Sequence, residues 1–234
     1  MSQITEYLYA SDSIASIDQA VLVLPEIYGL KPFAKQLADR CGSELFMTGY
    51  ALDYFYALTG TANDFDYQTG AERGVELMRQ MTGEKFIELL NQAIDTIHER
   101  QPQLKHLAVI GFCFGGRLAY LSGVNHAVTR IVSFYGAGSN EPNFYEGYSA
   151  IESLANNRRN TTHLRVMGLF GTHDDSIPAT DRQAINSKLT AAGIPTLMKE
   201  YDAGHAFFNA DRADRYSQPA ATQAWQDLKS WLLT

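Results

Sequence analysis

One cysteine of this 234-residue sequence lies between glycines directly after an apolar run. Residues 111–116 are GFCFGG and follow HLAVI, so Cys113 has the form glycine-x-nucleophile-x-glycine where a strand is predicted to give way to a helix. Such a turn lifts a nucleophile above a sheet, and the flanking positions must be small because strand and helix approach closely there. A buried structural cysteine beside a tight glycine turn fits the same pattern. Partner residues must decide between these two interpretations.

A carboxylate and a histidine follow at positions where such a nucleophile needs them. GTHDDSIP comes after a predicted strand and contains Asp174 and Asp175, while AGHAFF comes after the last predicted strand and contains His205. The order nucleophile, acid, base along the chain is typical of this turn. His173 also lies at a strand end, but it is adjacent to the acid that would have to orient it. We therefore expect His205 to be the base.

These residues need a scaffold of alternating strands and helices, which the hydrophobic pattern predicts. Strands are expected at 20–26, 44–50, 106–112, 130–136, 166–171 and 196–202, and helices from about 31, at 84–100, 115–123, 179–192 and near the C-terminus. Continuous apolar strands favour an α/β fold with a mostly parallel central sheet, helices on both faces and the site at the carboxyl ends. Segments 51–70 and 138–162 are too long for plain connections, so we expect lids or pocket walls.

Composition excludes several classes of function. An apolar fraction of 45% and a charged fraction of 19% are typical of one soluble globular domain, here 1–234, acting as a monomer or small homo-oligomer. The formal charge of −7 disfavours nucleic acid and acidic membranes as partners. The N-terminus resembles no signal peptide, so a cytoplasmic location is expected. Cys41 and Cys113 match neither a disulfide framework nor a metal motif, and Cys41 is expected on a core-facing helix side.

Four motifs together resemble one known family. LPEIYG, GFCFGG, GTHDDSIP and AGHAFF are similar to the motifs of the dienelactone hydrolases, cysteine members of the α/β-hydrolase fold, from about Val21 to the C-terminus. The family pattern G-x-x-D-x-x-I-P places the acid four residues before the proline, here Pro178, which selects Asp174 over Asp175. The family also has a glutamate that holds or activates the nucleophile, and Glu26 matches it. Alternatively, Glu26 satisfies backbone N–H groups at the start of the next helix.

The mechanism that these groups imply is acyl transfer to a thiol. Cys113 attacks an acyl carbonyl as thiolate, His205 takes up the proton, and Asp174 fixes the imidazole tautomer. The backbone N–H groups of Ile27 and Phe114 are expected to form the oxyanion hole. Water then hydrolyses the thioester, so neither a metal nor an organic cofactor is needed. A tetrahedral adduct expels a thiolate more readily than an alkoxide, so the adduct with an ordinary alkyl ester reverts to the starting ester. Enol lactones, aryl esters and thioesters have better leaving groups and are therefore better candidate substrates than triglycerides or peptides.

Two functions from other classes remain open. A cysteine at a helix N-terminus also suits a thiol-redox protein, and a hydrolase fold can serve as a non-catalytic binding protein. The sequence has no C-x-x-C motif or nearby resolving cysteine, and neither function would need the acid and the histidine. Hydrolysis of a small-molecule ester or lactone is therefore the preferred hypothesis.

The resemblance also bears on which ester is cleaved. The namesake enzymes hold the carboxylate of dienelactone with two arginines, one four residues after the catalytic histidine and one in the loop after the second strand. These positions are Asn209 here and, in the closest match, Leu58. An anion without a cationic partner is desolvated at a penalty, so we expect an uncharged or differently charged substrate unless Arg73 or Arg212 takes over. The aromatic residues at 54–56 are either a pocket wall or core.

Overall fold

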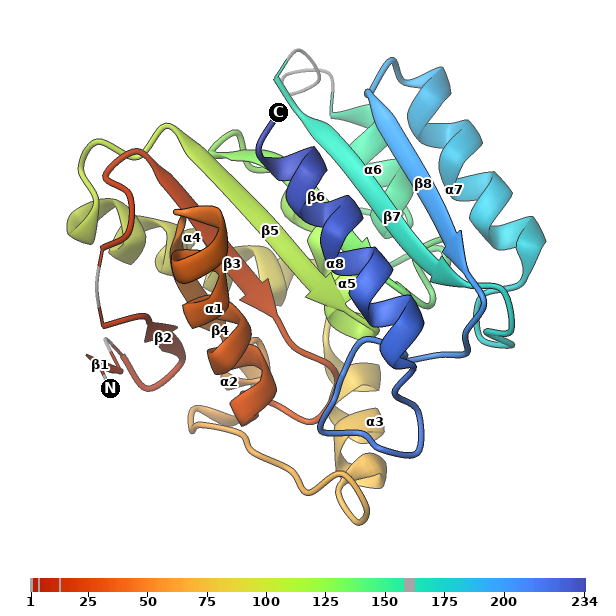
Figure 1. The fold of residues 1–234 in the computed structure, drawn as a ribbon, viewed down its shortest axis with the longest axis horizontal. Coiled ribbons are helices and arrows are strands. Elements are labelled where there is room, and N and C mark those ends of the chain that lie inside the picture. Colours follow the sequence, from red (N-terminus) through yellow and green to blue (C-terminus); the bar gives the residue numbers. More distant parts are fainter. Residues whose placement is uncertain (1, 4, 13, 158–162) are drawn as a thin grey trace.

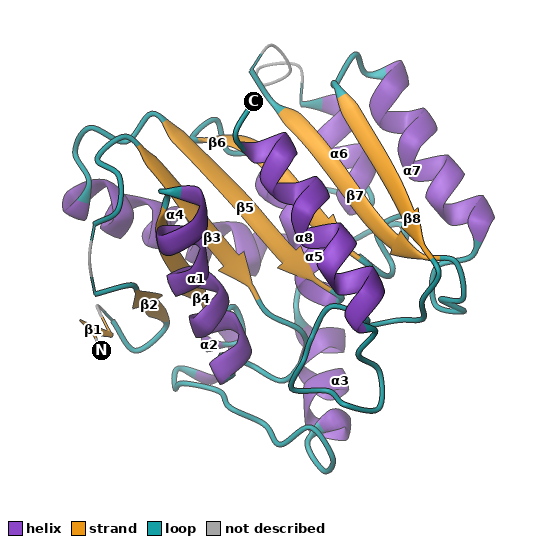
Figure 2. Ribbon diagram, viewed as in Figure 1, coloured by secondary structure: helices purple, strands orange, loops and turns teal. Residues whose placement is uncertain are grey.

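A twisted eight-stranded sheet runs through the molecule in the computed structural model, which describes residues 2–3, 5–12, 14–157 and 163–234 (Figure 2). Its strands are β1 (Ser2–Gln3), β2 (Leu8–Ala10), β3 (Gln19–Leu24), β4 (Thr48–Leu52), β5 (His106–Phe112), β6 (Val128–Phe134), β7 (Arg165–Gly171) and β8 (Thr196–Tyr201). They lie in the order β1-β2-β4-β3-β5-β6-β7-β8. All pairs from β4 to β8 are parallel, whereas β1 pairs antiparallel with β2 and β2 pairs antiparallel with β4.

Helices cover both faces of this sheet, as the sequence predicts for an α/β-hydrolase fold. They are α1 (Pro32–Leu45), α2 (Tyr56–Thr59), α3 (Ala71–Gln80), α4 (Gly83–Arg100), α5 (Phe114–Ser122), α6 (Ala150–Asn156), α7 (Ala179–Ala191) and α8 (Gln218–Leu232). Figure 1 shows α1 and α8 in front of the sheet and α4, α5 and α6 behind it. No helix within the described residues combines the length and apolar character needed to cross a membrane.

The central strands are apolar throughout because both of their faces are covered. Residues 20–24 of β3 and residues 107–112 of β5 are buried without interruption, the pattern expected of parallel strands in the middle of such a sheet. These two strands pair in parallel, with Leu24 opposite Gly111. The segment that follows β3 therefore lies beside the turn that follows β5.

Some predicted boundaries are wrong. The expected strand at 44–50 begins only at Thr48, because α1 continues through Leu45 and buries Cys41 and Leu45 on its core face. Phe46 then ends the helix in the left-handed conformation, with φ of 56°. Helices α2 and α6 occupy part of the two long segments expected as loops, and residues 158–162 of the second segment lie outside the described residues.

Candidate active site

Cys113 occupies a sharp turn between β5 and α5, as its glycine-flanked sequence predicts. Its backbone has φ of 55° and ψ of −120°, a conformation that costs a residue with a side chain about 1–3 kcal/mol, and its N–H donates to the carbonyl of Phe134 at 3.0 Å. A Cβ at Gly111 would overlap the carbonyl oxygen of Gly115, and a Cβ at Gly115 would overlap that of Pro25. Glycine at both positions thus permits the turn, and the thiol remains partly exposed.

The predicted acid and base meet at the carboxyl ends of the neighbouring strands. Asp174 follows β7 and accepts a hydrogen bond from Nδ1 of His205, which follows β8, with 2.7 Å between Oδ2 and Nδ1. The other oxygen of Asp174 accepts the Ser176 N–H at 2.9 Å. Asp174 is buried, whereas Asp175 is exposed in the adjoining turn and does not cap α7, whose N-cap is Pro178. The register taken from the proline therefore agrees with this geometry.

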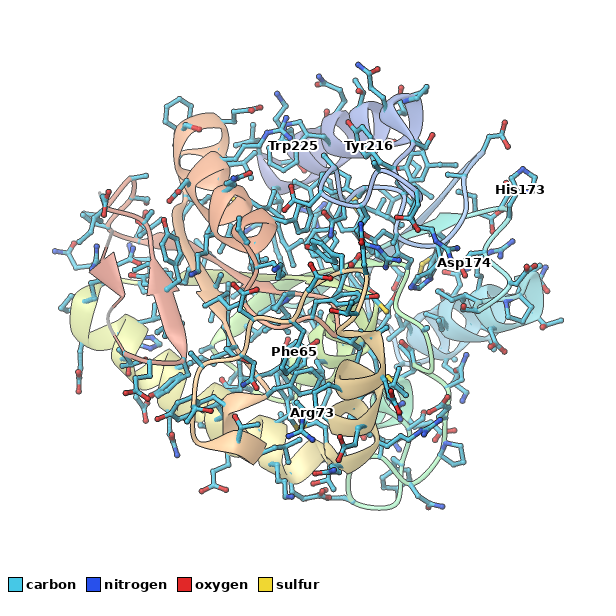
Figure 3. All side chains as sticks on the ribbon, turned by 90° about the horizontal axis from the view of Figure 1, so that it is seen from below. Phe65, Arg73, His173, Asp174, Tyr216 and Trp225 are labelled. Carbon is cyan, nitrogen blue, oxygen red and sulfur yellow. The ribbon has the colours of Figure 1, made fainter. Side chains whose placement is uncertain are left out.

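His173, the other histidine at a strand end, lies outside this arrangement. Its Nε2 pairs with the exposed Asp202 carboxylate at 2.6 Å. Figure 3, which looks onto the carboxyl ends of the strands, shows His173 further out than Asp174. A side chain in that position has no route to Cys113.

His205 is held between two negative groups. Burial alone lowers its pKa, but the Cys113 thiolate and the Asp174 carboxylate, each with a hydrogen bond to the imidazole, raise it from 6.5 to about 10. The two negative partners thus favour the charged form of the imidazole.

Glu26 follows β3, and its carboxyl group lies near enough to His205 to interact with it electrostatically. Its carboxylate accepts hydrogen bonds from the Tyr135 hydroxyl and the Asn209 amide, both at 3.3 Å, and lies 3.8 Å from Nη1 of Arg212. Burial raises the pKa of Glu26, while Arg212, His205 and these hydrogen bonds oppose the rise. The N-cap of α1 is Lys31, with no side-chain cap bond, so this geometry does not support a helix-capping role for Glu26.

The two expected oxyanion donors approach each other across the β3 and β5 strand ends. Phe114 is the first residue of α5, and Ile27 lies in the turn after β3. Within the described residues, neither backbone N–H is committed to another backbone acceptor. The Tyr54 hydroxyl bonds the carbonyls of Pro25 and Glu26 at 3.0 and 2.9 Å and so anchors the segment that carries Ile27.

Tyr135 is a site residue that the sequence analysis missed. It follows β6 directly, has φ of 40°, and its ring centroid lies 5.1 Å from that of His205. A polar aromatic residue at a strand end, in RIVSFYG, was a signal that could have identified it. By contrast, Tyr54 and Phe55 are buried and pack against the ring of Phe114, so they are core and not a pocket wall.

The chain is similar to known proteins over nearly its whole length, which includes all the candidate site residues. The family model described as dienelactone hydrolase family matches residues 4–234. The chain belongs to this family. Family membership makes this dienelactone hydrolase homologue a carboxylic ester hydrolase. Within the described residues, no group of three or more His, Cys, Asp or Glu side chains is placed to hold a metal ion.

Individual relatives are distant but cover most of the chain. A Synechocystis sp. protein named "Putative carboxymethylenebutenolidase" is 28% identical over 92% of this chain and 85% of its own. The "Carboxymethylenebutenolidase" of Pseudomonas putida is 24% identical over 86% of this chain and 80% of its own. A Klebsiella pneumoniae crystal structure named "Putative Dienelactone Hydrolase" has a TM-score of 0.75 at 24% identity, covering 91% of this chain and 85% of that one. That structural likeness establishes the shared fold.

The Asp174 and His205 geometry predicts unequal effects for two neighbouring substitutions. Asp174→Asn should lower kcat by about 10⁴-fold, because the amide leaves the imidazole in the wrong tautomer. Asp175→Asn, the matched control one residue away, should cost less than about tenfold, since that carboxylate touches no other candidate group. Steady-state hydrolysis of p-nitrophenyl acetate measures both variants. If they exchange behaviour, the acid is assigned to the wrong aspartate.

The charge of Cys113 should be visible in the titration of His205. The pKa of His205 in the folded protein lies above its usual value of 6.5. The contribution of its proton to the free energy of unfolding is therefore fully present below pH 6.5 and is lost as the pH rises through about 10. Cys113→Ser replaces the thiolate with a neutral hydroxyl and should lower the pKa of His205 by more than about one unit. Imidazole NMR shifts followed against pH measure this, with Cys41→Ala as the control that leaves the titration unchanged. An unaltered pKa in the serine variant would contradict the ion pair.

Proposed function

We propose that this dienelactone hydrolase homologue cleaves activated esters or lactones through Cys113, His205 and Asp174, with a thioester intermediate. The observation that carries the proposal is the buried Asp174 carboxylate at 2.7 Å from an imidazole whose other partner is the thiol of the strained turn. These are the nucleophile, base and orienting acid of covalent acyl transfer. The carboxymethylenebutenolidase names of the relatives agree with cleavage of an activated lactone.

The steps follow from where the protons start. The Cys113 thiolate adds to the acyl carbonyl, and the oxyanion that forms accepts hydrogen bonds from the N–H groups of Ile27 and Phe114. The His205 imidazolium gives its proton to the departing oxygen as the carbon–oxygen bond breaks, which leaves a thioester on Cys113. Neutral His205 then takes a proton from water, which attacks the thioester and releases the acid. The thiolate and imidazolium are restored at the end.

The surroundings of the site favour a substrate without a carboxylate. Asn209 is completely buried, and its amide group donates to Glu26 and to the Tyr67 hydroxyl at 3.1 Å and accepts the Asp211 N–H at 3.0 Å. It therefore has no hydrogen bond to offer an anion. Leu58, the other compared position, is an apolar residue of α2.

The two arginines that could replace the missing cations are already balanced by carboxylates. Arg212 lies over the Tyr28 ring and 3.8 Å from both Glu26 and Asp214. Arg73 pairs with Glu76 on the exposed side of α3. Neither leaves a surplus of positive charge at the site, so a substrate carboxylate would enter without a cation of its own.

The second cysteine of the sequence is not available to form a disulfide with Cys113. Cys41, the other cysteine, is fully buried in α1, and burial raises the pKa of its thiol to about 12. A thiol of this kind neither reacts nor resolves a disulfide at neutral pH. This observation favours hydrolysis over the redox hypothesis.

The two cysteines should differ completely towards an alkylating reagent. One equivalent of iodoacetamide at neutral pH should label Cys113, whose thiol is partly exposed, and should abolish hydrolysis of p-nitrophenyl acetate. Cys41 should stay unlabelled. Peptide mass spectrometry locates the label, and the Cys113→Ala variant shows the background rate. Activity that persists with Cys113 fully alkylated would overturn the proposed mechanism.

The balanced charges predict a preference between substrates. The value of kcat/KM should be higher for a neutral aryl ester or neutral lactone than for dienelactone, because the dienelactone carboxylate would be desolvated beside Glu26 without a free cation. Arg212→Gln serves as the control, since its effect on the two substrates should be similar. A clear preference for dienelactone that Arg212→Gln abolishes would show that Arg212 binds the carboxylate, contrary to this proposal.

A further inference from the structure

A cavity lies on the α1 and α8 face of the molecule, away from the candidate catalytic groups. Its volume is about 310 Å³, and it is formed by one side of α1, one side of α8 and the segment that joins His205 to α8. Figure 3 labels Tyr216 and Trp225, two of its lining residues, on a different part of the molecule from Asp174. None of the candidate catalytic residues lines it.

We propose that this cavity binds a small, uncharged aromatic molecule. Four aromatic side chains line it, those of Phe33, Phe208, Tyr216 and Trp225, of which Phe208 and Trp225 are largely buried. The guanidinium of Arg40 also lines it and lies 3.9 Å from the centroid of the Trp225 ring, a stacked cation–π arrangement. Arg40 is exposed, so a planar ring packed on the outer face of its guanidinium would continue this stack, and the exposed ring of Tyr216 supplies a further aromatic surface.

The charges around the cavity decide against an ionic ligand. Arg40 is the one charged side chain among its described lining residues, and its Nε pairs with Glu44 at 2.7 Å. Glu44 also accepts the indole N–H of Trp225 at 2.8 Å and pairs with Lys229 at 3.2 Å. Arg40 therefore already has a carboxylate partner, and an incoming anion would have to compete with Glu44 for its guanidinium. Nothing in the lining would pair with a cationic ligand.

The rim of the cavity adds a polar requirement. Gln36, Thr222 and Gln226 line it with amide and hydroxyl groups, which donate and accept hydrogen bonds without carrying charge. The size is at the low end of the range for small-molecule pockets, where one ring and a few substituents fit. An aromatic alcohol or amide has the matching chemistry.

A layer of rings separates this cavity from the nucleophile. Phe208 stacks on Phe112 with centroids 5.7 Å apart and an interplanar angle of 28°, and Phe33 meets Phe112 edge-on at 5.1 Å. Phe112 directly precedes Cys113, and Phe208 belongs to the segment that begins with His205. A ligand in the cavity therefore contacts the segment that positions the base, without entering the catalytic site.

The test uses 4-fluorobenzyl alcohol as the probe and protein whose Cys113 is fully alkylated, so that the catalytic site cannot contribute. Broadening of the fluorine NMR signal against protein concentration should give a Kd of about 1 mM, typical of a ligand with so few atoms. Thr222→Trp fills the cavity from its exposed rim and should raise Kd at least about tenfold. Gln223→Trp, the matched control on the outer side of the same helix, should leave Kd unchanged.

Several results would overturn the inference. These are equal affinity of the two tryptophan variants, absence of binding up to about 20 mM, equally tight binding of 4-fluorobenzoate, or equally tight binding of 4,4-difluorocyclohexanol. The benzoate result would show an anion site on Arg40, and the cyclohexanol result a non-specific apolar hollow. Circular dichroism checks that Thr222→Trp is folded, and Gln226→Trp provides a second blocking variant. Since the alkylated protein cannot turn over substrate, this outcome is independent of the proposed hydrolysis.

Discussion

The strained turn at Cys113 is the constraint on which the other parts of the site depend. Cys113 has a positive φ, and the turn brings α5 very close to β3 and β5. Only glycine fits at 111 and 115 in this approach, so the two glycines make the strained turn possible. The same approach brings the N–H of Phe114, at the start of α5, towards the segment 25–27 that follows β3. One steric requirement thereby determines the backbone geometry at Cys113 and brings Phe114, one proposed oxyanion donor, next to the segment that carries Glu26 and Ile27.

Burial disfavours the charged form of two ionisable groups of this site, and their partners offset this effect to different extents. His205 has two negative neighbours that hydrogen bond to it, one at 2.7 Å, so its pKa rises although burial disfavours the charged form. Glu26 has partners at 3.3 to 3.8 Å, which do not offset its loss of water, and its pKa also rises. The partners of His205 thus offset the cost of its burial more fully than the partners of Glu26 do.

Sequence patterns predict local features of this protein far better than they predict which segments meet. The run at 106–112 became β5 with the expected bounds, because its burial and its glycine turn are encoded within a few residues. Helix α6 was missed although Ser149 and Glu152 form a readable capping box at its start. The partners of Glu26, which are Tyr135, Asn209 and Arg212, come from two other strand-end segments. Their meeting depends on strand order, which hydrophobic periodicity does not encode.

The segment after β8 positions His205, the proposed base, without regular secondary structure. His205 is followed by Ala206 with φ of 64°, and then by Phe207 and Phe208, both buried. The Phe208 ring lies on the ring that precedes the nucleophile, so one aromatic contact joins the residues next to the base and next to the thiol. Packing of rigid rings replaces the hydrogen-bond ladder that a strand would supply. The relative positions of His205 and Cys113 therefore depend on how these rings pack, because close-packed side chains transmit small changes in volume.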